Sequence, residues 1–161
     1  MNNAGWRKGL WVLLTMTAWH STVWADGPIS IEDPWVRDAP PHAEMSAAYL
    51  IILNHSDQEQ TLLGISSPQF QKVEIHKTQM AGGQVHMQRL DKVAIAAHGS
   101  LEFKPGAYHL MMIHPAGTFK KGDMVELRLR FKDESQLTVQ AQIRESAEQA
   151  PAHDHHDMMM E

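Results

Sequence analysis

The chain has 161 residues, with 14 Lys and Arg against 19 Asp and Glu, 11 His, 11 Met and no cysteine. The absence of cysteine excludes disulfides, thiolate zinc sites and the His2Cys blue-copper centre, which requires a sulfur anion. A formal net charge of −5 without clustered Lys or Arg argues against nucleic acid as a partner.

The first 25 residues have the three-part plan of a secretory signal. Arg7 and Lys8 precede an apolar run over residues 10–18, and small or apolar residues that a signal peptidase recognises end at Ala25. The apolar run is too short to span a bilayer, which takes about 20 residues. We therefore expect export, cleavage after Ala25 and a mature chain that is not embedded in a membrane. A retained anchor or a buried helix is the alternative interpretation.

Residues 26–144 are predicted to form one all-β domain. Short stretches of β-prone residues are separated by Gly, Pro, Asn and Asp turn signals, a pattern typical of a sandwich or barrel. Residues 124–131 alternate apolar and charged side chains, which predicts a strand with one buried face. The expected strands are 29–31, 46–53, 61–65, 72–78, 85–90, 93–96, 109–113, 124–131 and 137–143.

Residues 145–161 differ in composition from the β domain. They lack the β-branched and aromatic residues that would offset the entropy of ordering, so we expect a disordered tail. Its clustered His and Met side chains are able to bind metal by composition alone, imidazoles favouring Cu(II) and thioethers Cu(I). An acidic, solubilising tail is the alternative. The candidate ligands of this second site are His153, His155, His156, Met158, Met159 and Met160.

A spaced set of His and Met residues is the strongest functional signal in the β domain. Ten residues separate His76 from Met87, and twenty-one separate Met87 from the pair His109 and Met111. Neutral imidazole and thioether suit soft, monovalent copper, whereas carboxylates and waters suit harder cations. At the His and Met content of this chain, such a set is expected by chance in about one sequence in three hundred. The pattern predicts a Cu(I) site formed by these four residues.

The expected strands bring these four residues together. A Gly-rich turn at 81–83 lies midway between His76 and Met87, so a hairpin there puts them directly opposite or one diagonal step apart. His109 and Met111 are two residues apart and share one face of a strand. The site should lie at the rim or surface, because copper that is handed on must be able to leave.

Residues around the predicted ligands divide by strand alternation. Glu74 shares the face of His76 and is a candidate to orient its imidazole. Met112 alternates away from the ligands and is expected in the core. His42 and Met45 are weaker candidates to approach the metal.

The spacing matches the H-x10-M-x21-H-x-M signature of periplasmic copper chaperones of the PCu(A)C type. The similarity covers about residues 29–144 and includes Ala47-Ala48-Tyr49 with Asn54, Gly106 before His109, and the strand around Leu127. The resemblance implies a cupredoxin-like β-sandwich and delivery of Cu(I) to the copper subunit of cytochrome c oxidase or a Sco-type assembly protein. It also implies that the tail forms a second copper site, which takes Cu(II) and supplies the first.

Two other functions stay open at this point. A copper-sequestering protein for metal tolerance would hold several ions in the tail and lose most of its capacity without it. A copper oxidoreductase would have to turn over, and the sequence shows no nucleophile–base pair or phosphate loop. We therefore expect a binding protein, not an enzyme.

Overall fold

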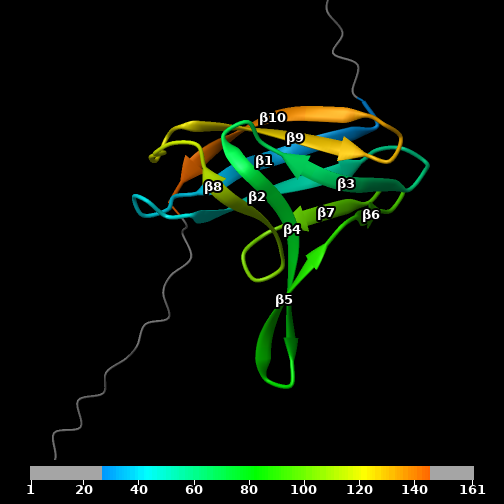
Figure 1. The fold of residues 1–161 in the computed structure, drawn as a ribbon. Coiled ribbons are helices and arrows are strands. Elements are labelled where there is room, and N and C mark those ends of the chain that lie inside the picture. The colour runs from blue at the N-terminus through cyan, green and yellow to red at the C-terminus, as the bar shows by residue number, and fades with distance from the viewer. Residues whose placement is uncertain (1–26, 146–161) are drawn as a thin grey trace, which may run out of the picture.

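The computed structural model describes residues 27–145, so the predicted signal segment and all of the predicted tail after Glu145 lie outside the described residues. Within this range the chain forms ten β-strands and no helix, and hence no helix able to cross a membrane (Figure 1). The strands are β1 (Ile29–Arg37), β2 (Met45–Asn54), β3 (Gln60–Ser66), β4 (Phe70–Ala81), β5 (Gln84–Leu90), β6 (Val93–Ile95), β7 (Ser100–Phe103), β8 (Tyr108–Pro115), β9 (Met124–Phe131) and β10 (Gln136–Arg144).

The predicted all-β class is confirmed, and every expected strand is present. Two differences have physical causes. Strand β1 continues to Arg37 because it passes through Asp33 and Pro34 as a β-bulge, with a positive φ of 41° at Asp33. These two residues resemble a turn signal in the sequence. Strand β7 was not predicted, since its four residues are too short to show an alternating pattern.

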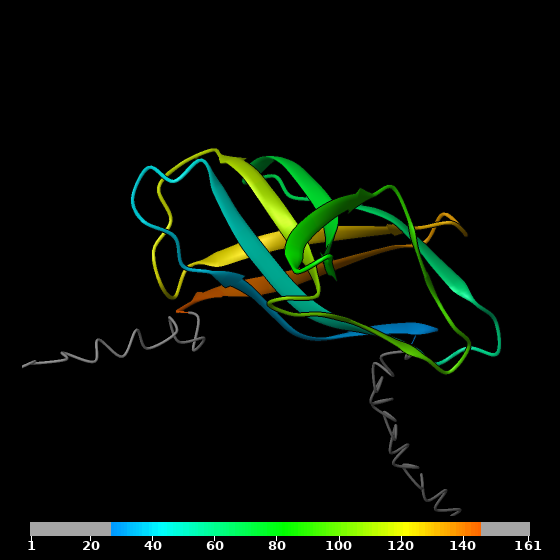
Figure 2. The same ribbon diagram turned by 90° about the horizontal axis from the view of Figure 1, so that it is seen from below.

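The ten strands form one mixed sheet in the order β5-β4-β8-β7-β2-β1-β10-β9-β3-β6, and β2 also pairs with β8. The sheet bends over on itself, as the two views show (Figures 1 and 2). The bend allows one core cluster to draw buried side chains from every strand except β5. This is the cupredoxin-like arrangement that the family resemblance implied.

Strand β9 shows how the sequence pattern produces this core. Its apolar residues Val125, Leu127, Leu129 and Phe131 are buried, and the charged residues between them face outward. Full burial of a Leu or Phe side chain contributes about 1.5–3 kcal/mol relative to leaving it in water.

The end of β4 and most of β5 form a two-stranded extension beyond the body of the sheet (Figure 1). We call residues 78–88 the outer hairpin. Its turn uses Gly82 and Gly83 at φ values of +59° and +75°, which a two-residue hairpin of primed type requires. Strand β5 is exposed except at Leu90, which packs on the edge of the core. Pairing to β4, not burial, therefore holds the outer hairpin in place.

Candidate functional site

Strands β5, β4 and β8 are neighbours in the sheet, and they carry the four predicted ligands. His76 on β4 lies directly opposite His109 on β8. Met87 on β5 lies opposite Thr78, which places it one diagonal step from His76. Of the two registers that the hairpin allowed, the structure has the diagonal one.

Strand alternation puts this group on the outer face of the sheet. Ile75 and Leu110, the neighbours of the two histidines, point into the core and are 3% and 0% exposed. The imidazoles of His76 and His109 therefore point the other way, yet each residue is only 9% exposed. The neighbouring side chains on this face shield both rings from water.

The imidazole of His76 is held by a carboxylate. Its Nε2 lies 2.9 Å from Oε2 of Glu74, the contact expected from their spacing. A hydrogen bond from Lys72 first, and that from His76 second, lower the pKa of Glu74 to about 2. The ionised carboxylate can only accept, so Nε2 of His76 donates the hydrogen bond. In the neutral ring its Nδ1, buried and without a hydrogen-bond partner, then carries a free lone pair.

The imidazole of His109 is oriented by the backbone. Its Nδ1 donates to the carbonyl oxygen of Ala107 at 3.3 Å, because a carbonyl oxygen can only accept. In the neutral ring of His109 the lone pair is thus on Nε2. The two ring centroids are 5.7 Å apart. Two adjacent imidazoles with free nitrogen lone pairs form one half of a metal-binding donor set.

The thioethers lie at the surface of the same region. Met87 is 62% exposed, and Met111, half-buried, lies opposite Glu74 on β4 and Ala47 on β2. A groove of about 370 Å³ lies between β2, β5, β8 and the segment that follows β1. It is lined by Arg37, Asp38, Ala39, Pro40, Met45, Ser46, Ala47, Met87, His109 and Met111.

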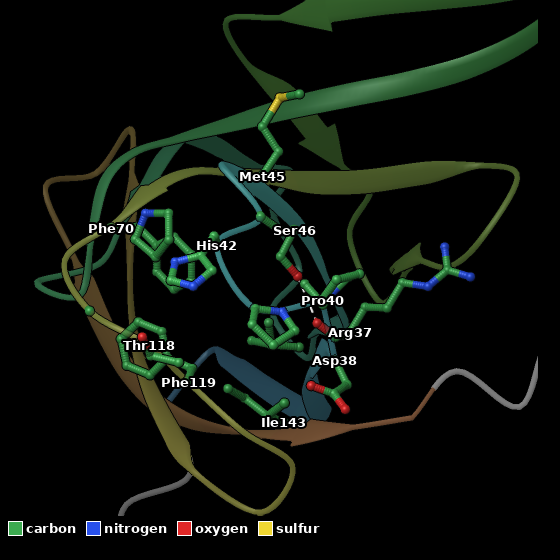
Figure 3. A pocket seen from close by; sticks show the side chains of 16 residues that line it. Arg37, Asp38, Pro40, His42, Met45, Ser46, Phe70, Thr118, Phe119 and Ile143 are labelled. Atoms are coloured by element: carbon green, nitrogen blue, oxygen red, sulfur yellow. Dashed lines mark hydrogen bonds between the residues drawn. The ribbon is translucent and has the colours of Figure 1, made fainter.

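The weaker candidates differ in the structure. Met45 lines both the groove and a neighbouring pocket, whereas His42 lines only that pocket, beside Phe70 and Phe119 (Figure 3). Met45 was only a weak candidate from the sequence, because the pairing of β2 with β8 that brings it near Met111 cannot be deduced from spacing along the chain.

Other predictions for this region are also tested. Met112 is fully buried in the core, as expected. Two further histidines make surface contacts away from the groove: His55 lies 2.7 Å from the hydroxyl of Ser30, and His98 lies 2.8 Å from Asp57.

Residues 27–145 contain no group of three or more His, Cys, Asp or Glu side chains arranged to hold a metal. A metal bound in the groove would need the thioethers.

Comparisons with known proteins agree with this architecture. Residues 29–143 match the family described as "Putative lipoprotein LpqE-like". The chain is 27% identical over 123 residues to protein RP573 of Rickettsia prowazekii, covering 74% of this chain and 68% of that protein.

Two solved structures share the fold. The copper-bound PCuAC domain from PmoF2 superposes with a TM-score of 0.63 at 22% identity, over 74% of this chain and 95% of that domain. The solution structure of the Cu(I) form of DR1885 from Deinococcus radiodurans gives a TM-score of 0.63 at 27% identity, over 75% of this chain and 81% of that protein. The match over residues 29–143 and these likenesses show that the chain belongs to the LpqE-like, PCuAC-type family.

Proposed function

We propose that this protein binds one Cu(I) ion through His76, Met87, His109 and Met111 and passes it to an acceptor protein. The observation that carries this proposal is the donor arrangement on β4, β5 and β8. Two oriented imidazoles, each with a free ring nitrogen, lie beside two accessible thioethers. Binding and transfer of this kind need no catalytic turnover.

The donor set favours Cu(I) over other ions. Thioether and neutral imidazole are soft or borderline ligands, and Cu(I) is the soft ion that they suit. Zinc should bind weakly here, because two of the four donors are neutral sulfurs. DR1885, which is 27% identical to this chain, was solved in a Cu(I) form, and this supports the same ion here.

The groove supports transfer rather than storage. Met87 is exposed on the outer hairpin, so an incoming ligand can reach the metal without unfolding the sheet. Thioethers also bind without losing a proton, which keeps ligand exchange simple. A store for several ions would instead depend on the tail.

The cellular setting belongs to the same proposal. A secretory signal ending at Ala25 and a family described as lipoproteins both support a location outside the cytoplasm, which we take to be the periplasm. The copper subunit of cytochrome c oxidase or a Sco-type assembly protein is the acceptor that the family resemblance implies.

Anaerobic Cu(I) titration of the protein without residues 1–25, with X-ray absorption spectroscopy at one equivalent, tests the site. We expect one tightly bound ion with mixed nitrogen and sulfur coordination. The double variant His76→Ala/Met111→Ala should lose this coordination. The matched control is His55→Ala/Met124→Leu, which removes one imidazole and one thioether away from the groove and should behave as the wild type.

Deletion of residues 145–161 distinguishes a chaperone from a sequestering protein. A chaperone keeps its one tight Cu(I) ion and still delivers it to a soluble fragment of a cytochrome c oxidase copper subunit. Two results would contradict the proposed site. One is that tight Cu(I) binding is lost when residues 145–161 are deleted, and the other is that binding is unchanged in His76→Ala/Met111→Ala.

A further inference from the structure

Five large hydrophobic side chains of the described residues are exposed to solvent. The large exposed hydrophobic residues are Met45, Met80, Val85, Met87 and Met124. Of these, Met45 and Met87 line the groove that also holds His109 and Met111. Met45 is 57% exposed and comes from β2, a strand that carries none of the four proposed ligands.

The sheet register places Met45 beside Met111. Ala47 on β2 pairs with Met111 on β8, and Met45 pairs with Ile113. Met45 and Met111 are therefore diagonal neighbours on the same face of the sheet. Diagonal neighbours are about 7–8 Å apart at Cα, within reach of long side chains. The three rotatable bonds of Met allow its sulfur to cover such a gap.

The backbone on both sides of Met45 is anchored. The hydroxyl of Ser46 donates to the carbonyl oxygen of Arg37 at 2.7 Å, and the amide of His114 donates to the carbonyl oxygen of Glu44 at 2.8 Å. Figure 3 shows the Met45 side chain directed away from His42 and the other rings of the neighbouring pocket. The main chain is thus anchored, while the side chain of Met45 is exposed at the groove.

The lining of the groove differs from the proposed ligand set in one respect. His109, Met87 and Met111 belong to both, but His76 does not line the groove and Met45 does. His76 is nearly buried and tied to Glu74. The side of the site that faces solvent therefore offers three thioethers and one imidazole.

We infer that Met45 is a third thioether ligand, which forms an outer Cu(I) position with Met87, Met111 and His109. This inference rests on the proposed function. Copper moves between the outer and inner positions by ligand exchange: the bond from copper to the sulfur of Met45 breaks as the bond to Nδ1 of His76 forms, and the reverse occurs on release. The ion stays Cu(I), and no proton or electron is transferred.

Met45→Leu tests this inference, because leucine keeps the apolar volume and removes the sulfur. Met124→Leu is the matched control, since Met124 is 48% exposed on β9 and does not line the groove. A chelator should strip Cu(I) from Met45→Leu about tenfold more slowly than from the wild type, a difference of about 1.4 kcal/mol in the barrier. Met124→Leu should match the wild type.

The outer position can also be observed directly when His76 is replaced. In His76→Ala, X-ray absorption at one equivalent of Cu(I) should report three sulfurs and one nitrogen. With ¹³C-methyl methionine labels, the Met45 resonance, assigned by its loss in Met45→Leu, should shift with those of Met87 and Met111. The Met124 resonance should not move. If circular dichroism shows that His76→Ala is unfolded, His76→Gln replaces it.

The outcomes separate this inference from the proposed function. If Cu(I) shifts Met87 and Met111 in the wild type but Met45 stays unmoved in the His76 variant, the outer position is refuted and the main site stands. The outer position is also refuted if a folded His76 variant binds no Cu(I). It is refuted likewise if a chelator strips Cu(I) from Met45→Leu at the same rate as from the wild type. If Cu(I) shifts none of these methyl groups in the wild type, the proposed function itself fails.

Discussion

The four donors of the proposed Cu(I) site lie in two regions that are built differently, with Met111 on β8 beside the histidines and Met87 apart on the outer hairpin. His76 and His109 are on paired strands whose alternate residues, Ile75 and Leu110, are packed in the core. Met87 is on the outer hairpin, which is held by strand pairing and a glycine turn and is largely exposed. The core therefore fixes the imidazoles, while the thioether of Met87 is carried by a segment that has little to hold it in place.

This difference suggests a division of labour within one site. Imidazoles that are already oriented lose little entropy when they bind an ion, so they can supply affinity. A thioether on an exposed hairpin can leave the ion without disturbing the core, so it can control access and release. A carrier needs both properties, because it must hold copper firmly and still give it up.

The largest effect should come from breaking the core behind the imidazoles. Leu110→Ala removes a fully buried side chain between His109 and Met111 and should lower the free energy of unfolding by about 2–5 kcal/mol. Val85→Ala on the outer hairpin, 60% exposed, should change it by at most about 0.5 kcal/mol. Urea unfolding of both variants measures the contrast, and equal losses would mean that the hairpin is as well supported as the body.

The next largest effect concerns the group that orients His76. Glu74→Ala removes the hydrogen bond to Nε2 and should weaken Cu(I) binding by about 10–100-fold, the range found for such supporting residues. Glu74→Gln, which can still accept that bond, should lose less. Competition with a chromophoric Cu(I) chelator measures both affinities.

Glu102→Ala is the control for this pair of variants. Glu102 contacts Lys104 two residues away, as Glu74 contacts Lys72, but it lies on β7 away from the groove. Its loss should leave Cu(I) affinity unchanged. An equal loss in Glu102→Ala would show that general electrostatics, not orientation of His76, accounts for the effect.

A smaller effect is expected on the sulfur side. Met87→Leu should lower Cu(I) affinity by about tenfold, or about 1.4 kcal/mol, and leave the free energy of unfolding unchanged. Met80→Leu is the control, because Met80 is 69% exposed on the same hairpin but does not line the groove. If both variants lost affinity alike, the hairpin would act through its general shape and Met87 would have no ligand role.

The sequence was sufficient to predict the parts of this architecture that depend on local spacing. Alternation identified the buried face of β9, and the Gly82-Gly83 turn identified the hairpin. The same-face relation of Glu74 and His76 followed from their separation by two residues, and the structure has the hydrogen bond between them.

The parts that depend on pairing between distant strands were not accessible in the same way. Nothing in the spacing distinguishes a direct from a diagonal register for His76 and Met87, because the choice depends on where the turn closes. Likewise, the position of Met45 depends on β2 pairing with β8, which are separated by five other strands along the chain. Such contacts arise from packing of the whole sheet.

The smallest effect expected is a pH dependence of stability in the protein without copper. The pKa of Glu74 is lowered from 4.5 to about 2, chiefly by the hydrogen bond from Lys72 and then by that from His76. A lowered pKa in the folded state means that the ionised carboxylate stabilises the fold. This contribution is complete above pH 4.5 and is lost as the pH falls towards 2.

Glu74→Gln should therefore be less stable than the wild type at pH 6, and the difference should shrink as the pH falls from 4.5 towards 2. Urea unfolding of both proteins across this range measures the difference. The difference at pH 6 serves as the reference, because the Glu74 carboxylate is ionised there. A difference that stayed the same in acid would mean that the shape of this side chain, and not its charge, supports the nitrogen half of the site, and the contrast with the hairpin would then be one of packing alone.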